Sequence, residues 1–200
     1  MSSGSRASAS PTAGGAAGAG WVRLASPPAT VVVGVLVVVS LAADEWLAIL
    51  NRQGDVFTAI TLTAVTSIFA GVGVVVARRE PGNPVGWILA GVGLSFIVCT
   101  FGASDYLALD YGRHHGRLPL GAVAVVLGAC WMVPLLFGPL VILLFPDGRL
   151  PSRRWRWVLG AYLVSAAALV AGEVTTGLTA IIEQRVRVNA SGNLTSPGPG

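Results

Sequence analysis

The sequence predicts an all-α fold: a polytopic transmembrane helical bundle of about five spans, with a disordered N-terminal tail. Three observations predict it. Of the 200 residues, 54% are hydrophobic and 11% are charged, and the mean hydropathy is +0.73, whereas soluble domains carry roughly 25% charged residues. Several apolar stretches are long enough to cross a bilayer as helices. Short arginine-containing loops separate these stretches. We therefore expect a multi-pass protein of the cell's inner (plasma) membrane, with the lipid bilayer as its partner.

The N-terminal stretch lacks the side chains that a folded region needs. Residues 1–20 are almost wholly Ser, Ala, Gly, Pro and Thr. Such a composition buries too little apolar surface to offset the entropy lost on ordering. We predict a disordered cytoplasmic tail over residues 1–28.

The first span is predicted over residues 29–50. Its small residues at Ser40 and Ala42 resemble a signal-peptide cleavage site, and cleavage of span one stays open as an alternative. The long polar leader and the continuing apolar run argue for a retained span. Asp44 and Glu45 are expected at the outer membrane interface, where charged groups remain hydrated.

Four further spans follow, each helical because the bilayer core offers backbone groups no partner outside the helix. They are predicted over residues 56–77, 85–104, 118–145 and 157–178. The fourth span contains Pro134 and Pro139, which predict kinks because proline removes a helical hydrogen bond. Residues 179–200 are predicted to form a polar C-terminal tail or loop.

The arginines predict the orientation of the bundle. The chain carries 13 basic residues, all arginine, and a net charge of +4. With the N-terminus inside, 8 arginines fall on the cytoplasmic side and 5 outside, and short loops rich in Lys or Arg stay cytoplasmic. Loops 78–84 and 146–156 are thus predicted to be cytoplasmic. Because the arginines lie between spans, they indicate topology control and anionic lipid headgroups rather than nucleic acid.

These two loops share a pattern of paired arginines followed by a tryptophan at the start of the next helix. The residues that we single out are Arg78, Arg79, Asn83, Pro84 and Trp87 in one loop, and Pro146, Asp147, Gly148, Arg149, Arg153, Arg154, Trp155 and Arg156 in the other. Pro-Asp-Gly ends a helix in a tight turn. A topogenic turn with an aromatic anchor explains the pattern better than a ligand site does.

The two stretches RREPGNPVGWIL and LLFPDGRLPSRRWRW resemble the loop signatures of the N-terminal membrane region in actinobacterial sensor histidine kinases and related membrane-anchored signalling proteins. The resemblance implies a sensory or anchoring module of a two-component system. In that family, a dimerisation and phosphoacceptor helix and an ATP-binding domain follow a six-span sensor. These 200 residues hold no such helix or ATP box, so we expect no catalysis, no cofactor and no autophosphorylation. A response regulator is an expected partner only if a kinase domain follows.

Few residues are candidates for chemistry. Asp110, His114 and His115 fall in the predicted third loop, between residues 105 and 117, and are weak metal candidates. Solvated loop residues are the favoured interpretation, so no metal site is predicted. Glu173 is the one charge well inside an apolar run, and an intramembrane carboxylate is a functional candidate. Its position near the predicted end of span five favours the interface instead.

Three alternatives remain beside the signalling module. A fragment of a small secondary transporter would bury charges near the midplane, but the second, third and fourth predicted spans hold none. An intramembrane enzyme would need a nucleophile and base within the spans, and none is found. A stand-alone membrane protein of another role stays open. Gly71 with Gly73, and Gly91 with Gly93, suit close helix contacts, so a homodimer through the transmembrane helices is a further expectation.

Overall fold

The computed structural model describes residues 27–51, 56–145, 148, 150 and 152–195. The predicted N-terminal tail lies outside these residues apart from its last two positions, and so do Pro146, Asp147 and Arg149. The all-α prediction is confirmed. The described helices are α2 Pro27–Asn51, α3 Val56–Arg79, α4 Pro84–Ser95, the π-helix η1 Phe96–Gly102, α5 Ala103–Arg113, α6 Gly121–Ala129, α7 Val133–Leu144 and α8 Trp155–Ile182.

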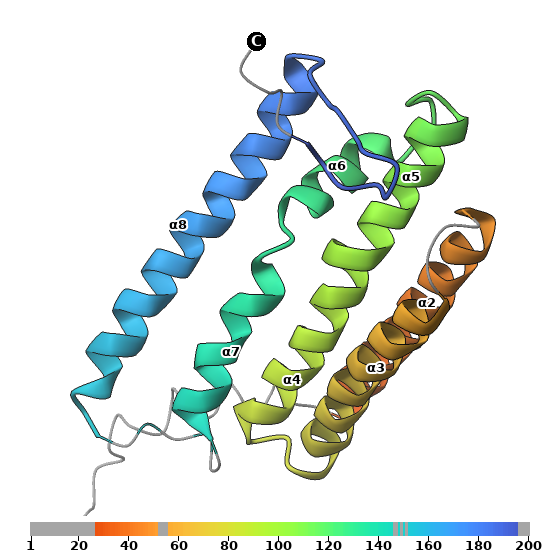
Figure 1. The fold of residues 1–200 in the computed structure, drawn as a ribbon. Coiled ribbons are helices and arrows are strands. Elements are labelled where there is room, and N and C mark those ends of the chain that lie inside the picture. Colours follow the sequence, from red (N-terminus) through yellow and green to blue (C-terminus); the bar gives the residue numbers. More distant parts are fainter. Residues whose placement is uncertain (1–26, 52–55, 146–147, 149, 151, 196–200) are drawn as a thin grey trace, which may run out of the picture.

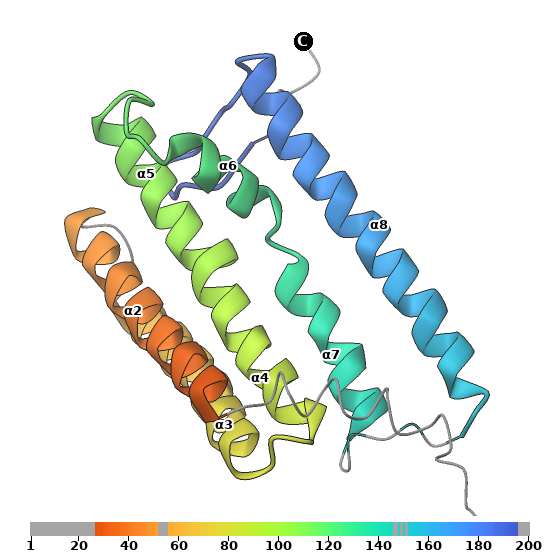
Figure 2. The same cartoon turned by 180° about the vertical axis from the view of Figure 1, so that it is seen from behind.

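The helices run up and down one bundle (Figures 1 and 2). The connections that follow Arg79 and Leu144 lie at its lower end as drawn in Figure 1, and residues 114–120 and the C-terminal segment, residues 183–195, lie at its upper end. Among the described residues, four helices are long and apolar enough to cross a membrane, and α6 with α7 adds a fifth if the bent pair is one span. The two predicted cytoplasmic loops therefore share an end.

The hairpin of α3 and α4 is held by small residues. A Cβ atom added to Gly93 would lie 2.8 Å from Ala70 Cα, and one added to Gly73 would lie 2.7 Å from Ala90 Cα. The facing pairs are Ala70 with Gly93, Gly73 with Ala90, and Ala77 with Gly86. Because Gly and Ala have little or no side chain, the two backbones approach closely. Helices in membranes associate in this way, since no hydrophobic driving force acts between them.

The third span is longer than predicted. Helices α4, η1 and α5 form one apolar helix from Pro84 to Arg113, whereas the sequence placed its end at residue 104. Asp105 and Asp110 both lie within this helix: the backbone carbonyl of Asp105 accepts a hydrogen bond from Asn51 Nδ2 at 2.7 Å, and Asp110 is buried. The prediction of a loop starting at residue 105 was wrong, because residues 105–113 are helical.

The fourth span breaks into two helices. α6 ends at Ala129, α7 starts at Val133, and the two are bent by 43°. Pro134 explains the break, because its ring clashes with the carbonyl group four residues earlier, at Cys130, where α6 ends. Pro139 lies inside α7 without ending it. A kink at the first proline is confirmed, but the single 28-residue span is not.

The last helix and the C-terminal segment also differ from prediction. α8 extends from Trp155 to Ile182, so residues 179–182 are helical rather than tail. The C-terminal segment then folds back over the upper end (Figure 1), where Val186, Val188 and Leu194 pack around buried Leu107 and Val125. These three apolar side chains explain why the segment, which was predicted to be a polar tail or loop, packs on the bundle. Asn189 Oδ1 accepts from the backbone N–H groups of residues 191 and 193, which fixes its turn.

Candidate functional site

The two loop signatures meet at the lower end. Asn83 is the N-cap of α4: its Oδ1 accepts a hydrogen bond from Val85 N at 3.0 Å. Pro84 follows at the first helical turn, where its missing N–H costs nothing. A Cβ atom on Gly148 would lie 2.8 Å from Asn83 Oδ1 and closer still to Pro84 Cδ. Gly148 also has a φ of +68°, so both the space and the backbone conformation favour glycine.

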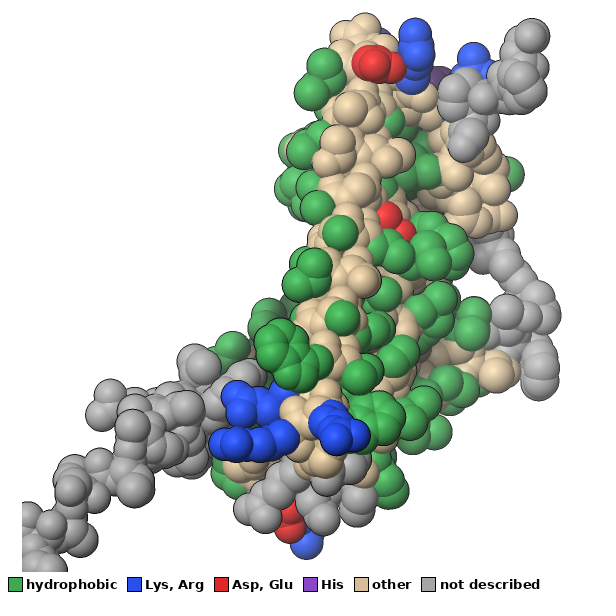
Figure 3. Space-filling view, turned by 90° about the vertical axis from the view of Figure 1, so that its left-hand side faces the viewer, with side chains coloured by type: hydrophobic (Ala, Val, Ile, Leu, Met, Phe, Trp, Pro, Cys, Tyr) green, Lys and Arg blue, Asp and Glu red, His purple; other side chains and the backbone are tan. Residues whose placement is uncertain are grey.

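The loop arginines face outward around this contact. Arg78, Arg79, Arg153, Arg154 and Arg156 are exposed, and Figure 3 shows a basic cluster below a surface that is largely apolar. Trp87 is half-buried and donates from Nε1 to Pro81 O at 3.3 Å, while Trp155 is 42% exposed. This arrangement suits arginines and aromatic rings at a membrane interface.

The weak metal candidates do not form a site. Asp110 is 1% exposed, and its Oδ1 accepts from Leu118 N at 2.9 Å, so it holds the connection between α5 and α6. His114 and His115 are exposed. Within the described part of the chain, no group of three or more His, Cys, Asp or Glu side chains could hold a metal ion. Asp110 is thus a structural residue, which its sequence position did not reveal.

An open groove of about 1040 Å³ lies in the upper half of the bundle. Its walls come from η1, α6, α8 and the C-terminal segment. Trp131, Met132 and Leu169 provide apolar surface, and Thr100 and Glu173 provide polar atoms. Further polar side chains also line it, among them Ser104, Arg187 and Asn193, so the groove combines apolar and polar surface.

Glu173 lies farther from the end of its helix than the sequence predicted. It precedes the end of α8 by nine residues, about 13 Å at the helical rise. Its Oε2 is buried and has no hydrogen-bond partner, and the same holds for Oγ1 of Thr100. Gly177 lies one turn further along α8. A Cβ atom added to Gly177 would lie 3.2 Å from Ala129 Cβ, so this face of α8 faces α6. The helix continues past residue 178, where the sequence placed the end of span five.

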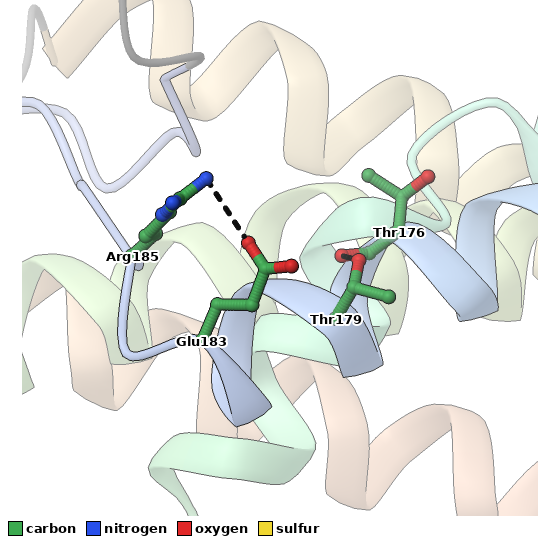
Figure 4. A network of polar contacts seen from close by, with 4 residues as sticks. All are labelled: Thr176, Thr179, Glu183 and Arg185. Atoms are coloured by element: carbon green, nitrogen blue, oxygen red, sulfur yellow. Dashed lines mark hydrogen bonds and ion pairs between the residues drawn. The ribbon is translucent and has the colours of Figure 1, made fainter.

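Further polar side chains line the groove along α8 and beyond its end. Thr176 and Thr179 lie on α8, and Glu183 follows the end of the helix (Figure 4). Arg185 pairs with Glu183 at 3.2 Å. Both partners of this ion pair are well exposed, so it contributes little to stability. The pair occupies the described arginine nearest in sequence to Glu173.

The burial of Asp44 against another helix was not predicted from the sequence. Asp44 was expected at the interface, yet it is 8% exposed, and its Oδ1 has no hydrogen-bond partner. It lies beside η1, since a Cβ on Gly102 would be 3.7 Å from its Oδ1, and Asp105 is close enough to interact electrostatically. Its neighbour Glu45 accepts from Thr63 Oγ1 at 2.7 Å. No signal within α2 alone could show that Asp44 meets another helix.

Comparison with known proteins adds no identification. No protein-family model, curated protein or solved structure matches this chain. The resemblance to sensor kinase membrane regions therefore rests on the residues of the two loops.

Proposed function

We propose that this chain is the membrane sensory or anchoring module of a bacterial signalling protein of the two-component type, located in the inner membrane and without catalytic activity of its own. The observation that carries the proposal is the path along α8. This helix borders the groove at the upper end and starts directly after the arginine loop at the lower end. Its 28 residues span about 42 Å, so one rigid element connects the two ends.

The contact between the two lower loops supports the same proposal. A movement of α8 or α7 at the lower end would displace Asn83 and Pro84, because Gly148 in the loop between α7 and α8 packs against both. Tight backbone contacts transmit small displacements because packed structures do not deform continuously. A ligand in the groove would then have a physical route to the predicted cytoplasmic end.

The genomic reading frame tests this proposal. We expect the frame to continue beyond codon 200 into a sixth span, a dimerisation helix and an ATP-binding domain. A response regulator would then be the downstream partner. A stop codon at this position would remove the two-component assignment.

One observation favours a second candidate, a secondary transporter. Asp44 and Asp105 come from different apolar helices and lie within electrostatic range, and intramembrane carboxylates carry protons or cations in transporters. The seven-residue π-helix η1 lies between Asp44 and Asp105 in sequence. It also supports a transporter, because π-helical turns often mark functional sites. Substrate uptake that is lost in Asp44→Asn would favour this candidate.

The orientation gives a separate prediction. With Cys99 and Cys130 replaced by alanine, a single cysteine at position 112 is expected to react with an impermeant maleimide in intact cells. A cysteine at position 152 is expected to react only after permeabilisation. Both positions are exposed and lie at opposite ends of the bundle, so accessibility within the protein is matched. Strong labelling at 152 and none at 112 in intact cells would reverse the orientation.

A further inference from the structure

We propose that the groove in the upper half of the bundle binds an amphipathic organic cation, whose ammonium group lies on Glu173 and whose apolar body lies against Trp131, Met132 and Leu169. This inference rests on the proposed sensory function in one respect: the ligand is the stimulus only if the protein is a sensor. Binding itself can be measured without any signalling partner.

The charge of the ligand follows from Glu173. A carboxylate removed from water is unfavourable unless a cation or hydrogen-bond donors accompany it. Oε2 of Glu173 is buried without a donor, and the described ion pair near it joins Arg185 to Glu183 instead. A ligand that brings its own positive charge meets this need at Glu173, because the two arginines that line the groove, Arg185 and Arg187, belong to the C-terminal segment and not to α8.

Thr100 supplies a second contact. Ser95 and Ser104 on the same helix donate their hydroxyl groups to backbone carbonyls about one turn earlier, at 2.7 and 2.8 Å. The Thr100 hydroxyl, inside the π-helical segment, is buried and has no partner. An ammonium group carries several donors, so it can bond both to the Thr100 oxygen and to the Glu173 carboxylate that line the same groove.

The apolar part of the ligand follows from the walls. Leu169 lies one turn before Glu173 on α8, and Met132 and Trp131 come from the break between α6 and α7. The Trp131 ring is 54% exposed, which leaves its face open to an aromatic or aliphatic body and to cation–π attraction. The volume of about 1040 Å³ exceeds that of a simple metal or alkylammonium ion and suits a larger organic molecule.

Equilibrium binding of tritiated 1-naphthylmethylamine to the protein in lipid nanodiscs tests the proposal, with empty nanodiscs as the correction for partitioning. We expect saturable binding of one molecule per chain. The neutral analogue 1-naphthalenemethanol should compete at least tenfold more weakly, a comparison that needs no variant. Glu173→Gln should lower the affinity at least tenfold and Thr100→Val about threefold, while the control Glu80→Gln, an exposed carboxylate at the opposite end of the bundle, should stay within twofold.

Three results would overturn the proposal. The first is the absence of saturable binding above empty nanodiscs. The second is equal affinity for the amine and the alcohol. The third is equal affinity of the folded Glu173→Gln variant and the wild type for the amine. The signalling assignment is judged by the reading frame beyond codon 200, so either proposal can fail while the other stands.

Discussion

Gly73→Leu is expected to prevent stable assembly of the bundle, whereas Gly71→Leu, two residues away, is expected to be tolerated. A Cβ atom at position 73 would lie 2.7 Å from Ala90 Cα and 2.8 Å from the Leu89 carbonyl carbon. These are backbone atoms of a facing helix, so no side-chain rotation relieves the overlap. At position 71 a Cβ atom meets nothing within 4 Å.

The size of the effect follows from overpacking. Forcing extra carbons into a packed contact costs typically about 1–3 kcal/mol, and a backbone contact with no room to adjust belongs at or above the upper end. Thermal unfolding of detergent-purified protein, followed by size-exclusion chromatography, measures it. Gly93→Leu should behave like Gly73→Leu, since its Cβ would lie 2.8 Å from Ala70 Cα. Equal melting temperatures for the variants at 71 and 73 would contradict the small-residue interface.

Asp110→Ala is expected to lower the free energy of unfolding by about 1–3 kcal/mol, because it leaves the Leu118 N–H without its acceptor. Asp110→Asn retains an acceptor oxygen and should recover most of the stability. His114→Ala and His115→Asn are expected to stay within about 0.5 kcal/mol of wild type, as exposed residues usually do. Asparagine is chosen at position 115 because φ there is +55°, a conformation that it tolerates.

The same variants discriminate between a structural role and a metal site. A metal held by Asp110 and the two histidines would make all three positions equally sensitive, and a chelator would lower the melting temperature of the wild type. A structural Asp110 predicts loss at that position alone and no effect of the chelator. Chemical denaturation with and without a chelator provides both comparisons.

The small residues show how sequence pattern and structure relate. Glycine pairs at 71 and 73 and at 91 and 93 both predicted close helix contacts. The structure uses Gly73 and Gly93 against facing backbones, while a Cβ on Gly91 would meet the Phe137 ring at an ordinary 3.5 Å. Residues two apart on a helix point to different faces, and which face meets a partner depends on how the neighbouring helix is placed.

The loop motifs predicted the local structure of each loop, but they did not predict that the two loops contact each other. Asn83 and Pro84 predict a helix start, and the structure confirms it with a capping hydrogen bond. Proline in span four predicted a kink, and the break falls where the ring of Pro134 meets the carbonyl of Cys130. That Gly148 packs on this cap could not be predicted, because the two loops are more than sixty residues apart.

The sequence by itself determined the helical class, the presence of several apolar helices long enough to cross a membrane and the positions of the two arginine-rich loops. Each follows from composition and from the length of apolar segments, which are local properties. The tertiary structure decided the roles of the polar residues. Asp44, Asp110 and Glu173 carry similar charges in similar surroundings along the chain, yet one lies beside η1, one caps a connection and one borders a groove. The physical reason is that burial and hydrogen bonding of a polar side chain depend on which other helix lies against it.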